Sequence, residues 1–200
     1  MLNGELWQAL ADGQWMRAPE DATTPFGIAT DFKAAQACNF PQVSSFEDLG
    51  HRLDQRLDQR LDQLRISANV FVAINIEGYF RKICVRSMSR VEEGTSLGTA
   101  ASQQKEFFHK QLLGSLVGFW SPDCPRHLNI PGNHFHLLSN ERCHGGLLLD
   151  LEAASIVAGL HMQSNLKLSL PQTQDFRESD FSVDPNVALA RAETGGNVKR

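Results

Sequence analysis

Residues 115–150, SLVGFWSPDCPRHLNIPGNHFHLLSNERCHGGLLLD, contain the pattern that decides the fold. Two apolar runs flank a proline-containing connection, and this arrangement predicts a pair of strands. On the second strand His134 and His136 occupy alternate positions, so their side chains point to the same face. Two imidazoles placed in this way can both reach one metal ion at about 2.0–2.1 Å. His144 follows, ahead of Gly145–Gly146, where the backbone can approach a site closely.

Alternating apolar and polar residues predict further strands on both sides of this stretch. Residues 3–10 and 12–18 predict a hairpin, because Asp12-Gly13 is a strong turn signal between them. Two alternating runs flank Glu77-Gly78 within residues 69–90 and predict a second hairpin. Additional strands are expected at residues 25–32, 145–163 and 165–171.

One segment has the four-residue period of a helix instead. Residues 44–66 contain RLDQ three times in tandem, starting at positions 52, 56 and 60. This period keeps four leucines near one helix face, namely Leu53, Leu57, Leu61 and Leu64. We expect an exposed surface helix, remote from the histidines. Residues 92–105 predict a loop, and Asp184 with Pro185 predicts the start of a short C-terminal helix.

Composition excludes several classes of protein. The chain has 200 residues, of which 42% are hydrophobic and 21% charged, so it can form a core. The net charge is −4, and the sequence has no stripe of basic residues, so we expect no nucleic-acid partner. Four widely spaced cysteines are typical of reduced thiols in the cytoplasm. The sequence begins without a signal-peptide pattern, and the most apolar stretches are interrupted by Asn75, Glu77, Asp150 or Glu152, so no membrane partner is expected.

The stretch 115–150 resembles the core signature of alpha-acetolactate decarboxylases. It contains that family's G-F-x-x-P pattern, then an H-x-H pattern, and then a Gly-Gly pair before a Leu-Asp. Other blocks resemble the family in the same order along the chain. They comprise residues 3–15, 24–32, 69–87 and 175–193. The resemblance therefore covers nearly all of residues 3–193.

The resemblance implies a function and a set of site residues. It implies decarboxylation of 2-acetolactate to acetoin and carbon dioxide, a lyase reaction of acetoin biosynthesis, with zinc or another divalent metal as cofactor. Two metal ligands fall on His134 and His136, and catalytic roles fall on Glu5, Arg86 and Glu193. The substrate is a small molecule, and the assembly that the family implies is a homodimer.

The chain departs from the family pattern at the third metal ligand, which the family places after Gly-Gly. Leu147 stands at that position, and a hydrocarbon side chain cannot bind zinc. His144 lies three residues earlier, so it points to the opposite face unless the glycines form a bulge. His127 is a more distant alternative. A carboxylate such as Glu5 or Glu193 could instead complete a site of two histidines and an acid.

Three functions therefore stay open. The first is a working acetolactate decarboxylase with an altered metal shell. The second is a catalytically impaired or inactive relative, indicated by Leu147 and by a chain that starts almost at the block containing Glu5. The family's tyrosine after the arginine block also has no counterpart in residues 92–105. The third is a cupin-like metal protein, because His134, His136 and Glu141 fit the spacing H-x-H-x₄-E.

The elements and the resemblance together predict a mixed, β-rich α/β fold. We expect two packed mixed β-sheet units with few helices, approximately residues 1–110 and 111–200 of one acetolactate decarboxylase-like domain. The site is expected in the crevice between them.

Overall fold

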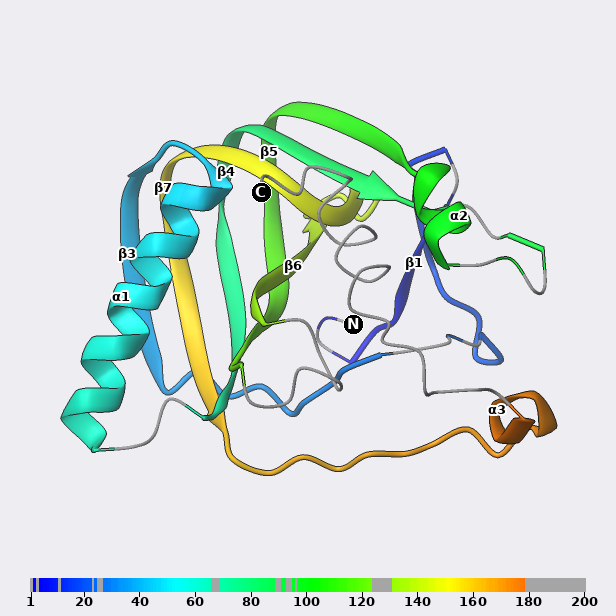
Figure 1. Ribbon diagram of the computed structural model, residues 1–200. Helices are drawn as coiled ribbons and strands as arrows, with labels where there is room; N and C mark the ends of the chain where they lie inside the picture. The colour runs from blue at the N-terminus through cyan, green and yellow to red at the C-terminus, as the bar shows by residue number, and fades with distance from the viewer. Residues whose placement is uncertain are drawn as a thin grey trace.

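The computed structural model describes residues 2, 4–10, 12–22, 24, 27–65, 69–88, 91–92, 95, 97–123 and 131–178. Within them the protein is β-rich and contains two sheets, as predicted from the sequence. The strands are β1 (Trp7–Ala9), β2 (Trp15–Arg17), β3 (Gln36–Val43), β4 (Phe71–Ser87), β5 (Lys105–Ser121), β6 (Gly132–Ser139) and β7 (Gly145–Gln163). The helices are α1 (Phe46–Leu64), α2 (Leu97–Ser102) and α3 (Gln174–Glu178) (Figure 1).

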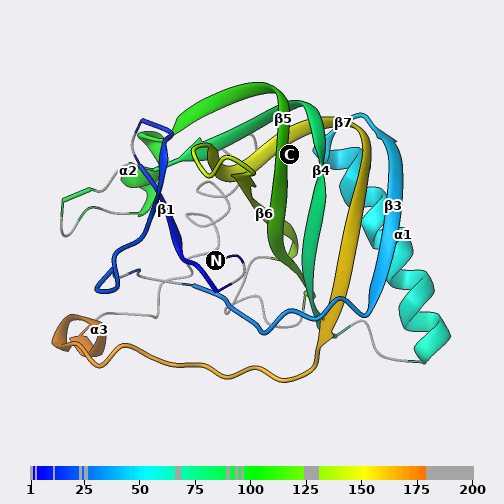
Figure 2. The ribbon, with the colours of Figure 1, turned by 180° about the vertical axis from the view of Figure 1, so that it is seen from behind.

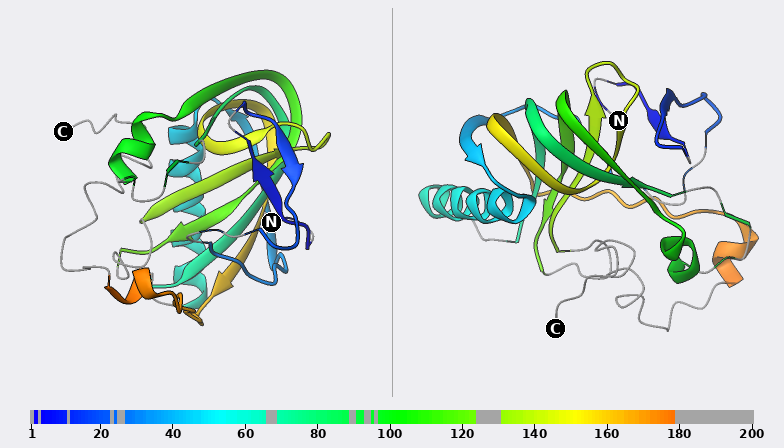
Figure 3. Two further views of the ribbon diagram at one scale, coloured as in Figure 1. Left: turned by 90° about the vertical axis from the view of Figure 1, so that its right-hand side faces the viewer. Right: turned by 90° about the horizontal axis from the view of Figure 1, so that it is seen from above.

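The main sheet has five strands in the order β3-β7-β4-β5-β6, and all of its pairings are antiparallel. It is strongly curved, because the first residues of β7 also pair with β6. The strands β7, β4, β5 and β6 therefore form a ring at one end of the sheet, which is visible in the two views of Figure 3. The hairpin β1–β2 lies beside this end, as seen from behind in Figure 2.

The helix α1 contributes its leucine face to the main core. Leu49, Leu53, Leu57 and Leu61 are each at most 4% exposed and join side chains from β3 to β7 in one cluster. Leu64 is 40% exposed, so the leucine stripe ends one turn earlier than predicted. The prediction of an exposed helix is therefore wrong for this face. The four-residue period is the signature of an amphipathic helix that covers a sheet.

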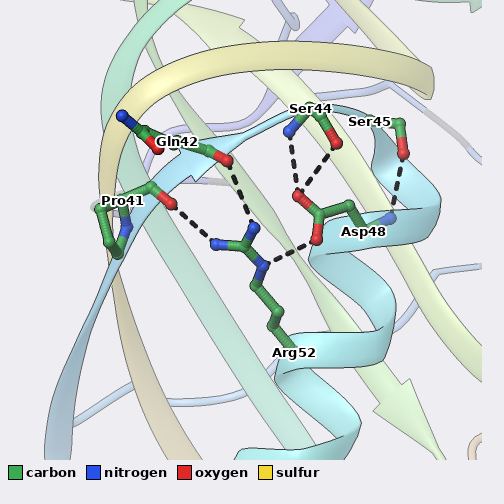
Figure 4. A network of polar contacts seen from close by, with 6 residues as sticks. All are labelled: Pro41, Gln42, Ser44, Ser45, Asp48 and Arg52. Atoms are coloured by element: carbon green, nitrogen blue, oxygen red, sulfur yellow. Dashed lines mark hydrogen bonds and ion pairs between the residues drawn. The ribbon is translucent and has the colours of Figure 1, made fainter.

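Local hydrogen bonds fix where α1 begins and how it meets β3 (Figure 4). The Ser45 hydroxyl accepts a bond from the Asp48 N–H (3.0 Å), and the Asp48 carboxylate accepts one from the Ser44 N–H (3.0 Å). That backbone bond and the neighbouring Arg52 guanidinium hold the pKa of Asp48 below its usual value. Arg52 also donates to the carbonyl oxygens of Pro41 (2.7 Å) and Gln42 (3.3 Å), which ties the helix to the end of β3.

The predicted hairpin at residues 69–90 is wrong. Residues Phe71–Ser87 form the continuous strand β4, which pairs with β5 on one side and β7 on the other. Gly78 lies in the middle of the strand, where an added Cβ would collide with the Ile156 side chain. The glycine therefore marks a close approach between β4 and β7 and a nearby irregularity in register, not a turn.

Of the other predicted elements, some are confirmed and some are wrong. The hairpin with a turn at Asp12-Gly13 is confirmed as β1–β2, and the strand pair of residues 115–138 is confirmed as β5–β6. Residues 27–32 and 165–171 form no strand, and residues 97–102 of the predicted loop form α2. Both wrong strand predictions rest on alternation, which does not supply a neighbouring strand to pair with. The helix predicted from Pro185 lies outside the described residues.

We predict that Leu57→Ala lowers the free energy of unfolding by about 2–5 kcal/mol, because it removes a fully packed side chain and leaves a cavity. Leu64→Ala is the matched control in the same helix. It should cost less than about 1 kcal/mol, because Leu64 is 40% exposed. Denaturant unfolding of both variants measures the difference, and equal losses would contradict the packing described for α1.

Candidate active site

His134 and His136 lie on the face of β6 that points away from the main core. The alternate residues Phe135 and Leu137 are buried in that core, at 1% and 0% exposure. The two imidazoles tilt toward each other, with ring centroids 5.1 Å apart and an interplanar angle of 51°. Their Nε2 atoms are 3.1 Å apart. The strand therefore presents two nitrogen atoms at a single point on its surface.

The separation of these nitrogens fits two ligands of one metal ion. Two ligands at 2.0–2.1 Å in a tetrahedral site lie about 3.3 Å apart. The pair also fits a hydrogen bond between a protonated and an unprotonated nitrogen, which needs no metal. Among the described residues, no group of three or more His, Cys, Asp or Glu side chains is placed to hold an ion. The described part of the chain thus offers two candidate ligands at this point.

The register of the ring of strands places Leu147 beside His136, and Arg86 beside Leu147 on the next strand. Leu147 pairs with His136 on β6 and with Arg86 on β4. Side chains directly opposite each other on antiparallel strands share a face, with Cβ atoms about 4.5–5.5 Å apart. The three side chains therefore share one face in neighbouring positions. Arg86 is 3% exposed, so the guanidinium lies in a buried environment at the end of β4.

Two glycines make this arrangement possible. Gly145 lies against the Leu137 carbonyl and under the Trp15 ring, where an added Cβ would come within 2.7 Å of Cε2. Gly146 has a φ of 147°, and its added Cβ would lie 2.6 Å from the Arg86 carbonyl oxygen. Neither position has room for a side chain. The start of β7 can therefore be held between β6 and β4, and Leu147 follows directly.

His144 contacts a different histidine. Its ring packs against that of His109 on β5, with centroids 4.6 Å apart. Burial lowers the pKa of His109, and the positive charge of a protonated His144 lowers it further. The backbone of His144 pairs with Ser139 and forms a bridge to Gln14 of the N-terminal hairpin. His144 precedes the first residue of β7, so the side-chain alternation of a continuous strand does not decide its direction. A metal-ligand role for His144 stays a prediction.

The carboxylates predicted for the site are not gathered around the histidine pair in the described part of the chain. Glu5 lies near the N-terminal hairpin, with Oε1 3.8 Å from an Arg17 nitrogen, and its side chain is 42% exposed. Glu141 is exposed, and its Oε2 lies 3.6 Å from the Cys143 sulfur. Glu193 and His127 lie outside the described residues. The catalytic roles of Glu5 and Glu193 therefore stay predictions.

Two buried or bridging groups near the pair were missed by sequence reasoning. Ser139 is 0% exposed, and its hydroxyl accepts bonds from the N–H groups of Cys143 (3.3 Å) and His144 (3.1 Å). It therefore holds together the turn between β6 and β7. Asp54 of α1 accepts hydrogen bonds from β5 and β6. A serine at a strand end is a weak signal, and the repeat that contains Asp54 gives no sign that one of its aspartates differs from the others.

Comparison with known proteins identifies the family. The family model "Alpha-acetolactate decarboxylase" matches residues 1–183. The chain belongs to the alpha-acetolactate decarboxylase family. It is 30% identical over 193 residues to the alpha-acetolactate decarboxylase of Methanosarcina mazei, covering 96% of this chain, and 25% identical over 191 residues to that of Brevibacillus brevis, covering 95%. The chain spans 64% of the length of each of these two relatives.

The fold agrees with solved structures of the alpha-acetolactate decarboxylase family. The crystal structure of alpha-acetolactate decarboxylase from Bacillus subtilis superimposes with a TM-score of 0.86 at 24% identity, covering 98% of this chain and 80% of that one. A Staphylococcus aureus protein of unknown function, described as similar to the enzyme, gives a TM-score of 0.84 at 24% identity, covering 96% of this chain and 78% of that one. Because the chain belongs to this family, the cupin-like alternative is no longer needed to explain the H-x-H spacing.

The helices in the described ranges include none long and apolar enough to cross a membrane.

We predict that Gly118→Ala disturbs the histidine strand. Gly118 on β5 lies against the His134 carbonyl, and an added Cβ would collide with that oxygen and lie 2.7 Å from the Phe135 ring. The substitution should lower the free energy of unfolding by about 1–3 kcal/mol through overpacking. Gly50→Ala in α1 is the control, because its Cβ would lie at an ordinary 3.6 Å from Asn133. Thermal unfolding should show that Gly50→Ala is neutral or stabilising by up to about 1 kcal/mol.

Proposed function

We propose that this member of the family decarboxylates 2-acetolactate to acetoin, using a divalent metal such as zinc held by His134 and His136. The observation that carries the proposal is the 3.1 Å separation of the two Nε2 atoms on the family's H-x-H strand. When bound, such an ion would supply Lewis-acid polarisation of the ketone and hydroxyl oxygens of the substrate. The family assignment supports the substrate class.

The reaction needs three things from the protein. The bond between the substrate's hydroxyl-bearing carbon and its carboxylate breaks, and the electron pair moves toward the ketone to form an enediolate. The departing carboxylate must first be held in a fixed orientation. Negative charge on oxygen must then be stabilised, and the carbon that lost carbon dioxide must receive a proton to give acetoin.

Arg86 is the residue that we assign to the negative charge. Arg86 pairs with Leu147, and Leu147 pairs with His136. This register supports a place for Arg86 at the edge of the substrate site. A planar guanidinium can bind a carboxylate through two parallel hydrogen bonds, and it stays charged in a buried environment. For the proton donor we retain Glu5 and Glu193 as candidates. A carboxylic acid can deliver a proton to carbon when it is positioned against it.

A second candidate function is a relative with low metal affinity and impaired catalysis. The observation that favours it is Leu147, whose side chain shares a face with His136 at the position where the family places a third ligand. A leucine there removes a nitrogen donor and fills the space with hydrocarbon. The metal would then depend on two imidazoles and on ligands from elsewhere in the chain or from solvent.

Activity of the purified protein tests the first function. We expect acetoin release from 2-acetolactate in the presence of zinc and its loss after treatment with a chelator. His134→Ala and His136→Ala should each reduce kcat/KM by about 100-fold or more, which equals about 2.7 kcal/mol of transition-state stabilisation. His51→Ala, at an exposed position of α1, is the matched control and should leave activity unchanged. Zinc binding without any acetoin release would instead support the impaired relative.

Restoring the third histidine tests the role of Leu147. We expect Leu147→His to raise zinc affinity by about tenfold or more, because a third imidazole would face the pair from the adjacent strand. His144→Ala is the comparison and should leave zinc affinity unchanged, since His144 packs on His109. Calorimetric titration with zinc measures both. Loss of zinc binding in His144→Ala would mean that His144 is the third ligand and that our assignment of position 147 is wrong.

A further inference from the structure

The aspartates of the RLDQ repeat have different surroundings in the folded protein. Asp54, in the first copy, receives two hydrogen bonds on one carboxylate oxygen. Trp120 Nε1 of β5 donates to Asp54 Oδ1 at 3.0 Å, and Asn133 Nδ2 of β6 donates to the same oxygen at 3.3 Å. Hydrogen bonds to an ionised acceptor are stronger than those between neutral groups. One side chain of α1 therefore links two strands of the main sheet.

The bonded residues sit directly behind the histidine pair. Trp120 and Asn133 are partners across the β5–β6 ladder, and the next pair in register is Phe119 and His134. Adjacent residues of a strand point to opposite faces, so Asp54 holds one face of the ladder and His134 projects from the other. A shift at Asn133 would therefore move the backbone that carries His134.

β5 ends at Ser121 and β6 begins at Gly132, so their separation in sequence is far longer than the two-residue turns that set the register of tight hairpins. Contacts within the sheet and with its covering helix therefore contribute to the pairing of the strand ends. Asp54 is such a contact, at the end of the ladder where β6 begins.

We propose that Asp54 is a positioning residue for His134, and that the RLDQ helix sets the geometry of the histidine pair in addition to covering the core. The geometry of the repeat explains why one aspartate, and not its equivalents, reaches the strands. Successive copies advance by four residues, which rotates each aspartate by about 40° around the helix. Asp58 occupies the same place in the second copy. Both aspartates are exposed, so burial does not distinguish them, and it is Asp54 that receives the bonds from β5 and β6. The effect on catalysis rests on the proposed function, whereas the positioning of the imidazoles does not.

The experiment compares Asp54→Ala, Asp54→Asn and the control Asp58→Ala in the full chain. Nitrogen-15 NMR of the His134 and His136 rings reports their environment without metal or substrate, and calorimetric titration with zinc reports their use as ligands. We expect Asp54→Ala to shift the His134 ring resonances and to weaken zinc binding by about three- to tenfold, less than the loss of a group bonded directly to a ligand. Asp54→Asn keeps an acceptor oxygen and should recover most of both signals.

The control separates positioning from general stability. Asp58→Ala should leave the ring resonances and zinc affinity as in the wild type. Wild-type ring resonances in a folded Asp54→Ala variant would overturn the proposal, as would equal shifts in Asp58→Ala. If the wild type releases no acetoin or binds no zinc, the proposed function fails, and the NMR comparison still decides the positioning role. If Asp54→Ala does not fold, Trp120→Phe, which removes the Nε1 donor to Asp54, carries the test, and unchanged His134 resonances in it would overturn the proposal.

Discussion

The close approach of three strands at Gly145–Gly146 is the constraint on which the rest of the structure depends. An added Cβ at either glycine would meet the backbone of a neighbouring strand, at Leu137 on β6 or at Arg86 on β4. Because neither glycine has a side chain, the start of β7 can pair with both strands at once. This double pairing turns an open antiparallel sheet into a ring at one end.

The ring divides the sheet into two functional faces. One face carries the apolar side chains that pack against α1, and Phe135 of β6 belongs to this layer. The other face carries His134 and His136, whose nitrogens converge. Strand alternation makes the two faces inseparable, since the residues that anchor β6 in the core alternate with those that could bind a metal. Packing of the helix and geometry of the histidines are therefore linked through a single strand.

The same ring explains why Leu147 matters more than its sequence position suggests. It is three residues after His144, yet its neighbours across the strands are His136 on the preceding strand β6 and Arg86 from the distant strand β4. His144 contacts His109 instead. It lies in the turn that the Ser139 hydroxyl holds, immediately before β7 begins to pair with β6. A single hydrocarbon side chain thus lies between the residues for which we propose metal binding and charge stabilisation.

Sequence alone determined the features that depend on local pattern. The β1–β2 hairpin followed from Asp12-Gly13, the helix from the leucine period, and the shared face of His134 and His136 from strand alternation. These features need no knowledge of distant residues, because dihedral preferences and side-chain direction repeat along each element. The resemblance of residues 115–150 to a family signature added the expected chemistry.

Only the tertiary structure decided features that depend on a second strand. Gly78 has the local signature of a turn, yet it lies in the middle of β4 because Ile156 packs against it. Residues 165–171 alternate like a strand but have no ladder. The pairing of Leu147 with Arg86, and the bonds from Trp120 and Asn133 to Asp54, join segments far apart in sequence. Their physical basis is pairing and packing between segments that meet only in the folded chain, and no local pattern contains that information.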